Sequence, residues 1–447
     1  MNPLTRRIVN RGGLLAAMVA ASLAVFGCGK GDSDAADAAG KITVTVWDWH
    51  AADPSKGVGL WLMDIDREFE RRHPKIRIKH VAQSHTEYYQ IFKAAASARR
   101  GPDVVMLHQG SRILDQRDSL IPLNKYVTPE FRKKIVGWAL SCENYDPQGT
   151  PLAVPIAVQG LVWYVNTALL GKIGLDRNKM PQSWEAFLKA CEAARKIGKV
   201  GIAAGQREGS WGEWFINSSF FQTLTPDDRK RLVRGGLKWT DPKVAVLFVR
   251  IKELCDKGCF DRGVMSTPMF PDAGDVFMRG DAVFCLGLLS DVMHWKEFGD
   301  VIGPENLGVM TCPVYKPGPD ADKFPAGGGF AYGITQWAKH PDEAFAYIAF
   351  IANAENARTF LTDVGSFPAN QEYDRALIAD PTAKTIDGWL SADRGRPDLL
   401  SRITTEVNEA LRREIQRLMS GQTDAAGAAD AVERTAAAER TRKAAAK

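Results

Sequence analysis

The spacing of hydrophobic residues changes between two periods in the N-terminal quarter of the chain. Residues 42–47 and 76–79 alternate between apolar and polar, as β-strands do, whereas residues 60–72 place apolar side chains on one helical face. Residues 88–99 form a second predicted helix, and residues 103–107 are nearly all apolar, which is typical of a strand inside a parallel sheet. This order of strands and helices predicts an α/β lobe.

Hydrophobic spacing in the rest of the chain predicts a second group of elements. Strands are predicted at residues 161–165, 282–286 and 307–311, and helices at residues 183–197, 241–257, 341–352, 354–363 and 401–419. Ser183, Thr225 and Asp241 are predicted to begin helices. Residues 425–446 are dominated by alanine, with Val432 as the one large apolar residue, so we predict a marginal helix that frays beyond Glu439.

The N-terminal residues predict an export signal. Arg6, Arg7 and Arg11 precede an apolar run that is too short for a comfortable membrane span, so residues 1–27 are expected to be a signal peptide. The run ends at Cys28 in a pattern that resembles a bacterial lipobox, which predicts lipidation of Cys28. Residues 28–40 are small and polar and are expected to form a flexible tether. A plain signal peptide or an N-terminal anchor helix is the alternative.

Composition and charge narrow the class of protein. Of 447 residues, 45% are hydrophobic and 25% are charged, which excludes a disordered chain, a collagen and a polytopic membrane protein. The length predicts two lobes. The net charge is +5, and three of these charges belong to arginines of the expected signal peptide, so nothing indicates nucleic-acid binding. The 12 tryptophans exceed what a core of this size needs, which points to a ligand site.

The cysteines and the absence of known catalytic motifs argue against several classes of enzyme. An exported chain can oxidise its cysteines, and a local Cys255–Cys259 disulfide is conceivable, whereas Cys191, Cys285 and Cys312 are expected to be buried thiols. The sequence has no Gly-x-Ser-x-Gly, no His-Glu-x-x-His and no nucleotide-binding fingerprint after a predicted strand. No catalytic residue, metal or cofactor is therefore predicted, although a glycosidase with two facing carboxylates stays open.

A series of short segments carries a family resemblance. In chain order they are VTVW (44–47), FERRHPKIRI (69–78), GPDVV (101–105), LIPL (120–123), VP (154–155), WYVN (163–166), MPQSWEAF (180–187), FMRGDAVF (277–284), PDEAFAYI (341–348) and GSFP (365–368). Together with the lipobox they resemble the extracellular solute-binding proteins of bacterial ABC importers, a group that includes maltose-binding protein and other sugar receptors. The resemblance covers about residues 42–420. It departs from the family pattern at residues 150–153, where Thr-Pro-Leu-Ala replaces an aromatic-glycine pair, and in having Cys142 and Cys312.

This resemblance implies an α/β, two-lobed periplasmic-binding-protein fold with a hinge cleft between the lobes. Lobe one is expected to hold residues 41–155 and 311–360, and lobe two residues 156–310 and 361–447, with an alanine-rich tail at 425–447. The implied role is to capture a sugar or oligosaccharide and deliver it to the permease subunits of an ABC importer. The expected protein is a non-enzymatic monomer in the periplasm or on the outer face of the cell membrane, anchored through lipid on Cys28.

Three alternatives stay open at this point. The same fold could bind another polar solute, such as a polyamine or a sugar phosphate, and the acids Asp48, Glu208 and Glu213 would suit a cation. The chain could instead be an exported carbohydrate-active enzyme, or a partner that reports a bound solute to a membrane receptor.

Candidate ligand-binding residues follow from the chemistry of sugars. Aromatic rings cover the apolar faces of a sugar, and fixed polar groups satisfy its hydroxyls, so we select such residues after predicted strands and in glycine-rich segments. The candidates are Trp49, His50, His108, Gln109, Gln159, Trp163, Trp211, Trp214, Asp291, Gly328 and Gly329.

Some of these candidates have an equally plain structural interpretation. Residues 208–214 hold two tryptophans and two acids among glycines, so we expect Trp211 and Trp214 to form an aromatic wall at the site. Trp163 fits the core as well as the site, and Asp291 fits a helix cap as well as a ligand contact. Gly328 and Gly329 leave room for a ligand or for the other lobe, and they fit a flexible loop equally well.

Overall fold

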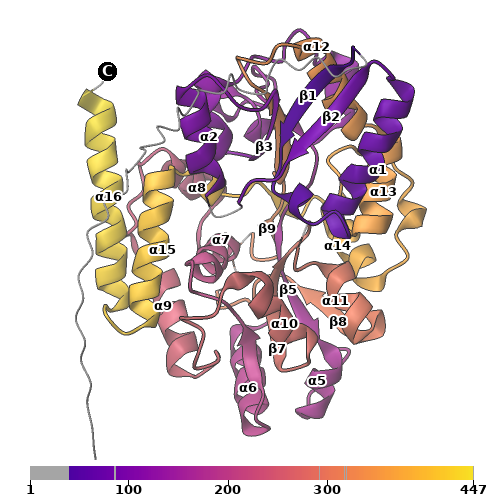
Figure 1. Ribbon diagram of the computed structural model, residues 1–447. Helices are drawn as coiled ribbons and strands as arrows, with labels where there is room; N and C mark the ends of the chain where they lie inside the picture. The colour runs from indigo at the N-terminus through magenta and orange to yellow at the C-terminus, as the bar shows by residue number, and fades with distance from the viewer. Residues whose placement is uncertain (1–39, 85–86, 291, 317, 319, 446–447) are drawn as a thin grey trace, which may run out of the picture.

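The computed structural model describes residues 40–84, 87–290, 292–316, 318 and 320–445. The expected signal peptide, Cys28, nearly all of the expected tether and Asp291 lie outside the described residues. The chain forms two lobes, each built on its own β-sheet, with one sheet in the upper half of Figure 1 and the other in the lower half. Within the described part of the chain, no helix combines the length and the apolar character needed to cross a membrane.

The first lobe contains a five-stranded sheet. Its order is β2 (Ile76–Val81), β1 (Ile42–Trp47), β3 (Val104–His108), β10 (Phe330–Ile334) and β4 (Val154–Pro155). Strands β2, β1 and β3 are parallel, whereas β10 runs antiparallel to both of its neighbours. Because β3 is central and covered on both faces, four of its five residues are fully buried, as its apolar sequence predicts.

The second lobe contains a four-stranded sheet. Its order is β6 (Val200–Ala203), β7 (Ala282–Leu288), β5 (Leu161–Asn166) and β8 (Leu307–Met310). Strands β6 and β7 are parallel, and β5 is antiparallel to β7 and β8. Every residue of β5 and β7 is buried. A short pair, β9 (Phe324–Pro325) with β11 (Gly395–Arg396), lies outside both sheets.

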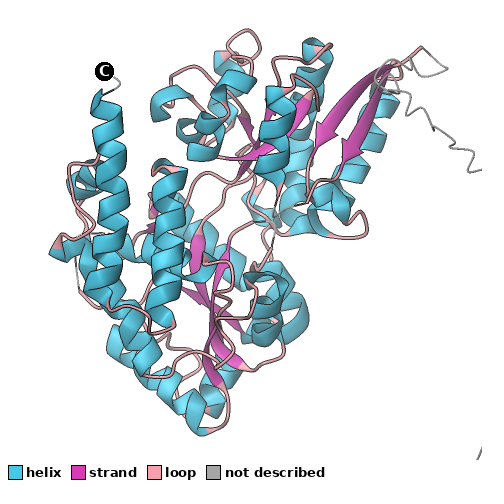
Figure 2. Cartoon of the chain, turned by 60° about the vertical axis from the view of Figure 1, so that its left-hand side comes forward, coloured by secondary structure: helices cyan, strands magenta, loops and turns pink. Residues whose placement is uncertain are grey.

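Helices cover the faces of the sheets in both lobes, as Figure 2 shows. In the first part of the chain they are α1 (Gly57–Arg72), α2 (Tyr88–Ser97), α3 (Ser111–Asp115), α4 (Pro129–Lys134), α5 (Thr167–Lys172), α6 (Trp184–Lys196), α7 (Ser210–Thr223), α8 (Pro226–Val233) and α9 (Pro242–Asp256). After these come α10 (Gly274–Met278), α11 (Trp295–Ile302), α12 (Pro341–Ile351), α13 (Ala354–Thr359), α14 (Pro381–Ser391), α15 (Thr405–Met419) and α16 (Ala425–Ala445).

Three of the helix starts confirm the capping signals of the sequence. The Ser183 hydroxyl accepts a hydrogen bond from the Ala186 amide at 3.2 Å and begins α6. Thr225 and Asp228 form a capping box at α8, and Asp241 caps α9.

Three segments of chain connect the lobes and are joined by backbone hydrogen bonds. They are residues 156–160, 326–330 and 365–370, and we call them the crossing segments. The Ile156 amide donates to the Phe330 carbonyl at 3.0 Å, and the Val158 amide donates to the Phe367 carbonyl at 2.7 Å. The Gly327 amide donates to the Gln159 carbonyl at 2.9 Å. The connection between the lobes is therefore an irregular three-stranded ribbon.

The packing corrects the predicted boundaries between the lobes. Residues 311–326 were expected in lobe one, but Cys312 and Phe324 pack in the core of the second lobe. Val364 and Ala369 pack in the core of the first lobe, although residues after 360 were expected in lobe two. The difference arises because the chain enters and leaves the first lobe at the crossing segments, which no hydrophobic pattern marks.

The C-terminal helix is longer than the sequence predicts. Helix α16 continues to Ala445 and packs against α9 and α15 (Figures 1 and 2). Its buried face consists of Val432 and alanines, whose small side chains allow close approach of the neighbouring helices. Glu433 accepts a hydrogen bond from the Trp239 amide at 2.8 Å, and Glu439 accepts one from the Thr404 hydroxyl. Beyond Glu439, Arg442 forms an ion pair with Glu406 of α15. The prediction of fraying there is wrong because such tertiary contacts supply what intrinsic helix propensity lacks.

Candidate ligand-binding site between the lobes

One edge of the first sheet collects most of the first-lobe candidates. Strands β1 and β3 are parallel to one another and end at this edge, and the antiparallel strand β10 begins there, with Phe330 opposite His108. In open α/β sheets, ligands bind outside the carboxyl ends of the strands. The structure therefore brings Trp49, His50, His108, Gln109, Gly328 and Gly329 together beside the crossing segments.

Trp49 and His108 form an aromatic surface at this edge. The Trp49 ring stands edge-on to Tyr88, with ring centroids 4.7 Å apart, and lies 4.8 Å from the His108 ring. The His108 Nδ1 atom and the Tyr89 hydroxyl are 2.9 Å apart, which fixes the imidazole. Arg112 lies over the Tyr89 ring at 4.6 Å. Trp49 and His108 are only partly buried, so this surface can cover an apolar ligand face.

Asp48 is a buried carboxylate that holds the loop after β1. It accepts hydrogen bonds from the His50 amide and from the His50 ring, each at 2.8 Å, and a further one from the Tyr332 hydroxyl. Burial raises the pKa of Asp48, but the His50 ring and these hydrogen bonds outweigh it and hold the pKa below its usual range. Asp48 therefore fixes the position of His50. Because its oxygens already accept these hydrogen bonds, Asp48 is not available to bind the cationic ligand that its place in the sequence had suggested.

Gln109 has a structural role that its sequence position did not indicate. Its side chain is 5% exposed. The Nε2 atom donates to the Ser141 hydroxyl at 2.8 Å, and the Oε1 atom accepts from the Gly329 amide at 3.1 Å. Because this amide group binds the protein on both sides, Gln109 ties a crossing segment to the loop that contains Ser141 instead of reaching outward.

Gly328 and Gly329 are required by the approach of other protein groups. A Cβ atom on Gly328, which has φ +86°, would lie 2.4 Å from the Leu140 Cδ1 atom. A Cβ atom on Gly329 would lie 2.8 Å from the Ala157 carbonyl oxygen in another crossing segment. The atoms that these glycines accommodate belong to the first lobe and to a crossing segment, a role that the sequence did not indicate. Gln159 is partly buried in the same ribbon.

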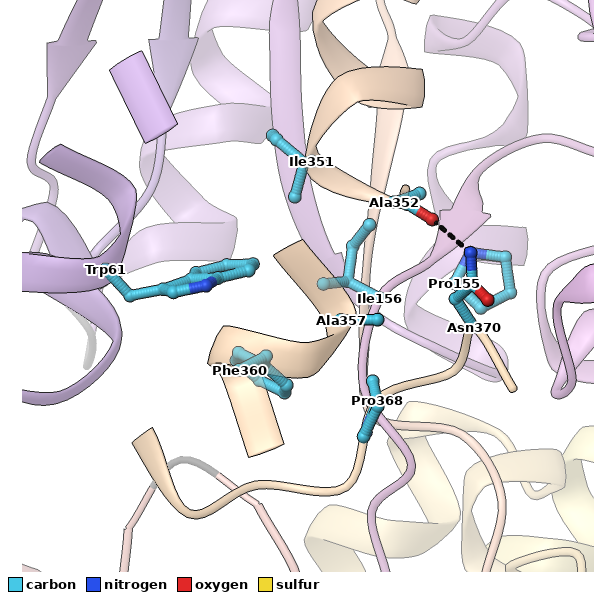
Figure 3. Close-up of a pocket in the computed structure, with 9 residues that line it drawn as sticks. All are labelled: Trp61, Pro155, Ile156, Ile351, Ala352, Ala357, Phe360, Pro368 and Asn370. Atoms are coloured by element: carbon cyan, nitrogen blue, oxygen red, sulfur yellow. Dashed lines mark hydrogen bonds between the residues drawn. The ribbon is translucent and has the colours of Figure 1, made fainter. Parts of the chain in front are cut away.

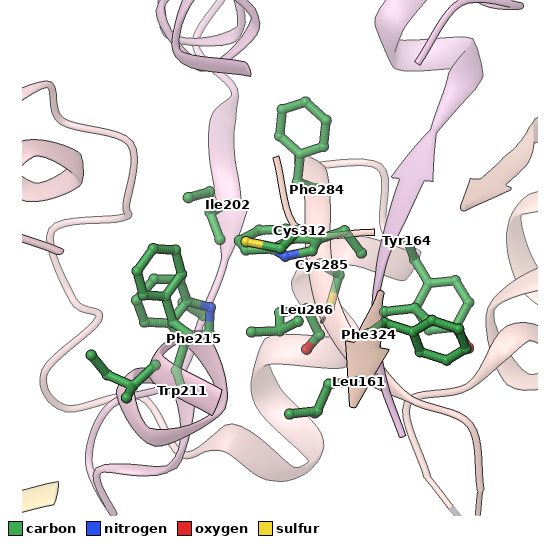
Figure 4. Packing of buried hydrophobic residues seen from close by; sticks show 14 of the residues in the cluster. Leu161, Tyr164, Ile202, Trp211, Phe215, Phe284, Cys285, Leu286, Cys312 and Phe324 are labelled. Atoms are coloured by element: carbon green, nitrogen blue, oxygen red, sulfur yellow. Dashed lines mark hydrogen bonds between the residues drawn. The ribbon is translucent and has the colours of Figure 1, made fainter. Parts of the chain in front are cut away.

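Trp163 and Trp211 lie in the core of the second lobe. Figure 4 shows Trp211 in this core beside Phe215. Both are fully buried. Trp211 stacks on Phe215 with ring centroids 5.4 Å apart and meets Trp163 edge-on at 6.4 Å. The expectation that Trp211 forms an aromatic wall is wrong for this conformation, because α7 begins at Ser210 and turns Trp211 toward the sheet. Trp163 lies on β5, whose residues are all buried, so its alternative role in the core is the one observed.

Trp214 and the two neighbouring acids are partly accessible but already have partners. Trp214 is partly buried and packs against Phe270, with ring centroids 5.6 Å apart. Glu213 forms an ion pair with Arg412 of α15. Glu208 pairs with Arg207 at 2.7 Å and accepts a hydrogen bond from the Met269 amide. These acids therefore offer less to a cationic ligand than their sequence context suggested.

A set of contacts between the lobes was not predicted. The Thr405 hydroxyl donates to the Asp115 carboxylate at 2.7 Å, and the Arg112 guanidinium lies 3.7 Å from the Glu409 carboxylate. A Cβ atom on Gly110 would lie 2.4 Å from the Ser401 carbonyl oxygen. We call these three pairs the interlobe contacts. Their residues belong to no recognisable motif, and the one available signal was a glycine directly after a predicted strand.

Asp398 lies beside the interlobe contacts and is surrounded by polar groups. Its carboxylate accepts hydrogen bonds from Asn217 Nδ2 at 2.7 Å and from the Ser401 amide at 3.2 Å. Burial, with a smaller contribution from the negative charge of Glu213, raises the pKa of Asp398 to about 6. Asp398 and Asn217 thus add polar groups to the second lobe close to Ser401, which belongs to the interlobe contacts.

Two hollows in the molecule are lined by none of the predicted site residues. Figure 3 shows a cavity of about 10 Å³ behind the crossing segments, lined by Trp61, Pro155 and other mostly apolar residues, where Asn370 donates to the Ala352 carbonyl at 2.8 Å. Its volume is at the lower limit for one water molecule. A pocket of about 260 Å³ on the second lobe is lined by Lys243, Arg250 and neighbouring residues and contains no predicted site residue. Among the described residues, no cluster of His, Cys, Asp and Glu could hold a metal ion.

Proteins of similar sequence are named as binding proteins. A Pyrococcus horikoshii protein named an uncharacterised ABC transporter extracellular-binding protein is 25% identical over 66% of this chain and 68% of its own length. The maltodextrin-binding protein of Bacillus subtilis is 22% identical over 69% of this chain and 70% of its own. The sn-glycerol-3-phosphate-binding periplasmic protein of Brucella abortus is 27% identical, over 40% of each chain.

Solved structures share the two-lobed fold. A chitin oligosaccharide binding protein superposes with a TM-score of 0.77 at 22% sequence identity, covering 89% of this chain and 98% of that one. A maltose-bound protein of T. maritima superposes with a TM-score of 0.70 at 19% identity, covering 88% of this chain and 99% of that one. The family model of the bacterial extracellular solute-binding proteins matches residues 64–385. The chain therefore belongs to the bacterial extracellular solute-binding protein family.

Proposed function

We propose that this protein captures a sugar or oligosaccharide between its lobes and delivers it to an ABC importer. The observation that carries the proposal is the partly exposed aromatic surface of Trp49 and His108, at the sheet edge next to the crossing segments. Such a surface suits the apolar face of a pyranose ring. Polar groups from the second lobe, Asp398 and Arg402 among them, would meet the hydroxyls.

The relatives support the choice of ligand class. One named relative binds maltodextrin, and the structural neighbours include proteins named for chitin oligosaccharide and for bound maltose. Their names describe binding and not catalysis, which supports a non-enzymatic role for this chain. In this proposal, the protein is a monomeric receptor outside the cytoplasm, near the permease subunits that accept the solute. Export would depend on the signal peptide, and anchoring on the lipid at Cys28 and the tether that follows it.

Binding would act by shifting the balance between open and closed arrangements of the lobes. A ligand changes this balance only by the difference in its affinity for the two arrangements. The crossing segments give the lobes a common axis about which to move, and closure around a solute is a known use of such hinges. A sugar that contacts Trp49 from one side and the second lobe from the other would favour the closed arrangement.

A second candidate ligand class is a phosphorylated polyol or sugar. The Brucella relative is named for glycerol 3-phosphate. Arg112 of the first lobe lies near Glu409, and Arg402 of the second lobe lies over the Tyr145 ring, so a guanidinium group from either lobe could bind a phosphate. We rank this class second because Arg112 already lies near Glu409 and over the Tyr89 ring.

Calorimetry with a ligand panel tests both classes. The panel contains maltose, maltotriose, chitobiose, glycerol 3-phosphate and putrescine, titrated into the mature protein. We expect binding of at least one sugar in the micromolar range and weakening of at least tenfold in Trp49→Ala. Trp337→Ala is the matched control, because Trp337 packs on Phe92 beyond the opposite end of β10. Binding of the phosphate ester or the amine alone would refute the sugar proposal.

The enzyme alternative has its own test. Oligosaccharides that bind are incubated with the protein for a day, and the mixture is separated by chromatography. We expect the oligosaccharides to be recovered unchanged. Shorter products that disappear when Asp398 or Glu213 is replaced would revive the assignment as a carbohydrate-active enzyme.

A further inference from the structure

Three cysteines of the second lobe lie around strand β6. Cys191 is on the buried face of α6, Cys255 is in the last turn of α9, and Cys259 follows that helix. Cys191 and Cys259 are buried and Cys255 is partly exposed. All three are free thiols in the structure.

The register of β6 places Cys259 next to Gly201. Ile202 pairs in parallel with Phe260, and the Ile202 amide donates to the Cys259 carbonyl at 2.9 Å. One step back along both chains, Cys259 stands opposite Gly201. Residues that face each other across such a pair project to the same side of the sheet.

Cys191 occupies the space on that same side. A Cβ atom on Gly201 would lie 2.6 Å from the Cys191 Cβ atom and 2.7 Å from its Sγ atom. The missing side chain at Gly201 therefore makes room for Cys191, whose thiol comes beside that of Cys259. The pKa of Cys191 agrees with this proximity, because burial raises it far above the usual range and the neighbouring Cys259 raises it further.

We propose that Cys191 and Cys259 form a disulfide in the exported protein. A bacterial extracellular protein folds in an oxidising compartment, where neighbouring thiols are converted to disulfides. Each thiol loses a proton, one S–S bond forms, and the two electrons reduce the disulfide of an exported thiol–disulfide oxidoreductase to two thiols. The bond would join α6 to the end of α9 across β6 and would close a long loop that contains α7 and α8.

The geometry favours this pair over Cys255 with Cys259. Helix α9 ends at Asp256, so Cys259 lies outside the helix and does not share a helical face with Cys255. Cys259 also turns away from the helix axis after Gly258, which has φ +64°, and joins the ladder beside β6. Cys255 is then left as a partly exposed thiol.

Peptide mapping decides which cysteines are joined. The full chain is exported to the periplasm of a bacterial host, purified without reductant, alkylated in denaturant and digested with trypsin for mass spectrometry. We expect one linked peptide pair containing Cys191 and Cys259, with Cys255 alkylated, and loss of the link after reduction. Alkylation of both Cys191 and Cys259 before reduction, or a link from Cys259 to Cys255, would overturn the proposal.

Thermal unfolding with and without reductant gives an independent measurement. We expect reduction to lower the Tm by about 5 °C, because the disulfide restricts the unfolded chain. Cys191→Ala should abolish this reductant-dependent shift, and the matched variant Cys255→Ala should keep it. A shift that persists in Cys191→Ala contradicts the pairing. If Cys191→Ala does not fold, the mapping of the wild-type chain decides alone.

Discussion

Trp49 of the first lobe and the pair Trp163 and Trp211 of the second lobe have opposite surroundings. In the first lobe, Trp49 follows β1 at the edge of the sheet and stays partly exposed beside His108. In the second lobe, Trp163 and Trp211 are fully buried among other rings. The residue type is the same, but a position just after a strand leaves a ring accessible, whereas a position in a covered strand or the inner face of a helix buries it. The aromatic rings of the proposed site therefore lie on the first lobe, where Trp49 meets His108.

The largest expected effect is on stability and separates the two kinds of tryptophan. Trp211→Ala should lower the free energy of unfolding by about 3–5 kcal/mol, because it leaves a cavity between Phe215 and Trp163. Trp49→Ala should cost less than half as much, since its ring is partly exposed. Urea unfolding followed by circular dichroism measures both. Equal losses of unfolding free energy would show that the partly exposed Trp49 stabilises the fold as much as the buried Trp211 does.

A pH experiment distinguishes the lobes through their buried carboxylates. The pKa of Asp398 is raised from 3.8 to about 6, so the folded protein binds the proton more tightly than the unfolded chain does. Asp398 therefore favours folding at low pH, and this contribution of about 3 kcal/mol is lost as pH rises from about 4 to 6. Asp48 has a lowered pKa, so its contribution is present above the usual pKa and is lost as pH falls below it.

Two variants isolate these opposite trends. In Asp398→Asn, the fall in stability between pH 4 and 6 should disappear, and in Asp48→Asn the acid-side loss should become smaller. Denaturant unfolding at several pH values gives both curves. An unchanged pH profile in Asp398→Asn would show that the carboxylate is as well solvated in the folded chain as in the unfolded one.

An intermediate effect is expected on ligand affinity. His108→Ala should weaken sugar binding about tenfold, or about 1.4 kcal/mol, because it removes a ring from the surface shared with Trp49. Trp214→Ala on the second lobe should change affinity less than threefold, since Trp214 packs on Phe270. Calorimetry compares the two. A larger loss in Trp214→Ala would move the aromatic part of the site to the second lobe.

The smallest expected effect concerns the interlobe contacts. Asp115→Ala removes the acceptor of the Thr405 hydroxyl and should open the lobes slightly in the absence of ligand. A single exposed hydrogen bond contributes about 0.5–1 kcal/mol, so we expect affinity to change only two- to fivefold. Small-angle scattering should show a larger radius of gyration in the variant than in the wild type. Asp118→Ala, nearby but outside the contacts, should leave both quantities unchanged.

The fold could be predicted well from the sequence because its signals are local. Strand alternation at residues 42–47, the apolar run at residues 103–107 and the capping residues Ser183 and Asp241 all act within a few positions of themselves. The order of these elements, with the family resemblance, leads to two α/β lobes. The extent of α16 was not predictable because it depends on packing against α9 and α15.

The site was predictable only where strand ends determine it. Trp49 and His108 meet because β1 and β3 end at the same edge. The role of Gln109 depends on Ser141 and Gly329, which are distant in the sequence, and no spacing rule connects them. Trp211 was misplaced because the glycines around it resemble a loop, whereas the structure starts a helix there.

The two ends of the described chain belong to different lobes. Strand β1 opens the first sheet, whereas α16 packs on α9 and α15 of the second lobe. Fluorophores attached beside Lys41 and near Ala445 would therefore travel with different lobes, and the energy transfer between them would report lobe orientation. Such a pair gives a solute sensor whose labels lie outside the binding surface, so its signal does not depend on knowing the solute beforehand.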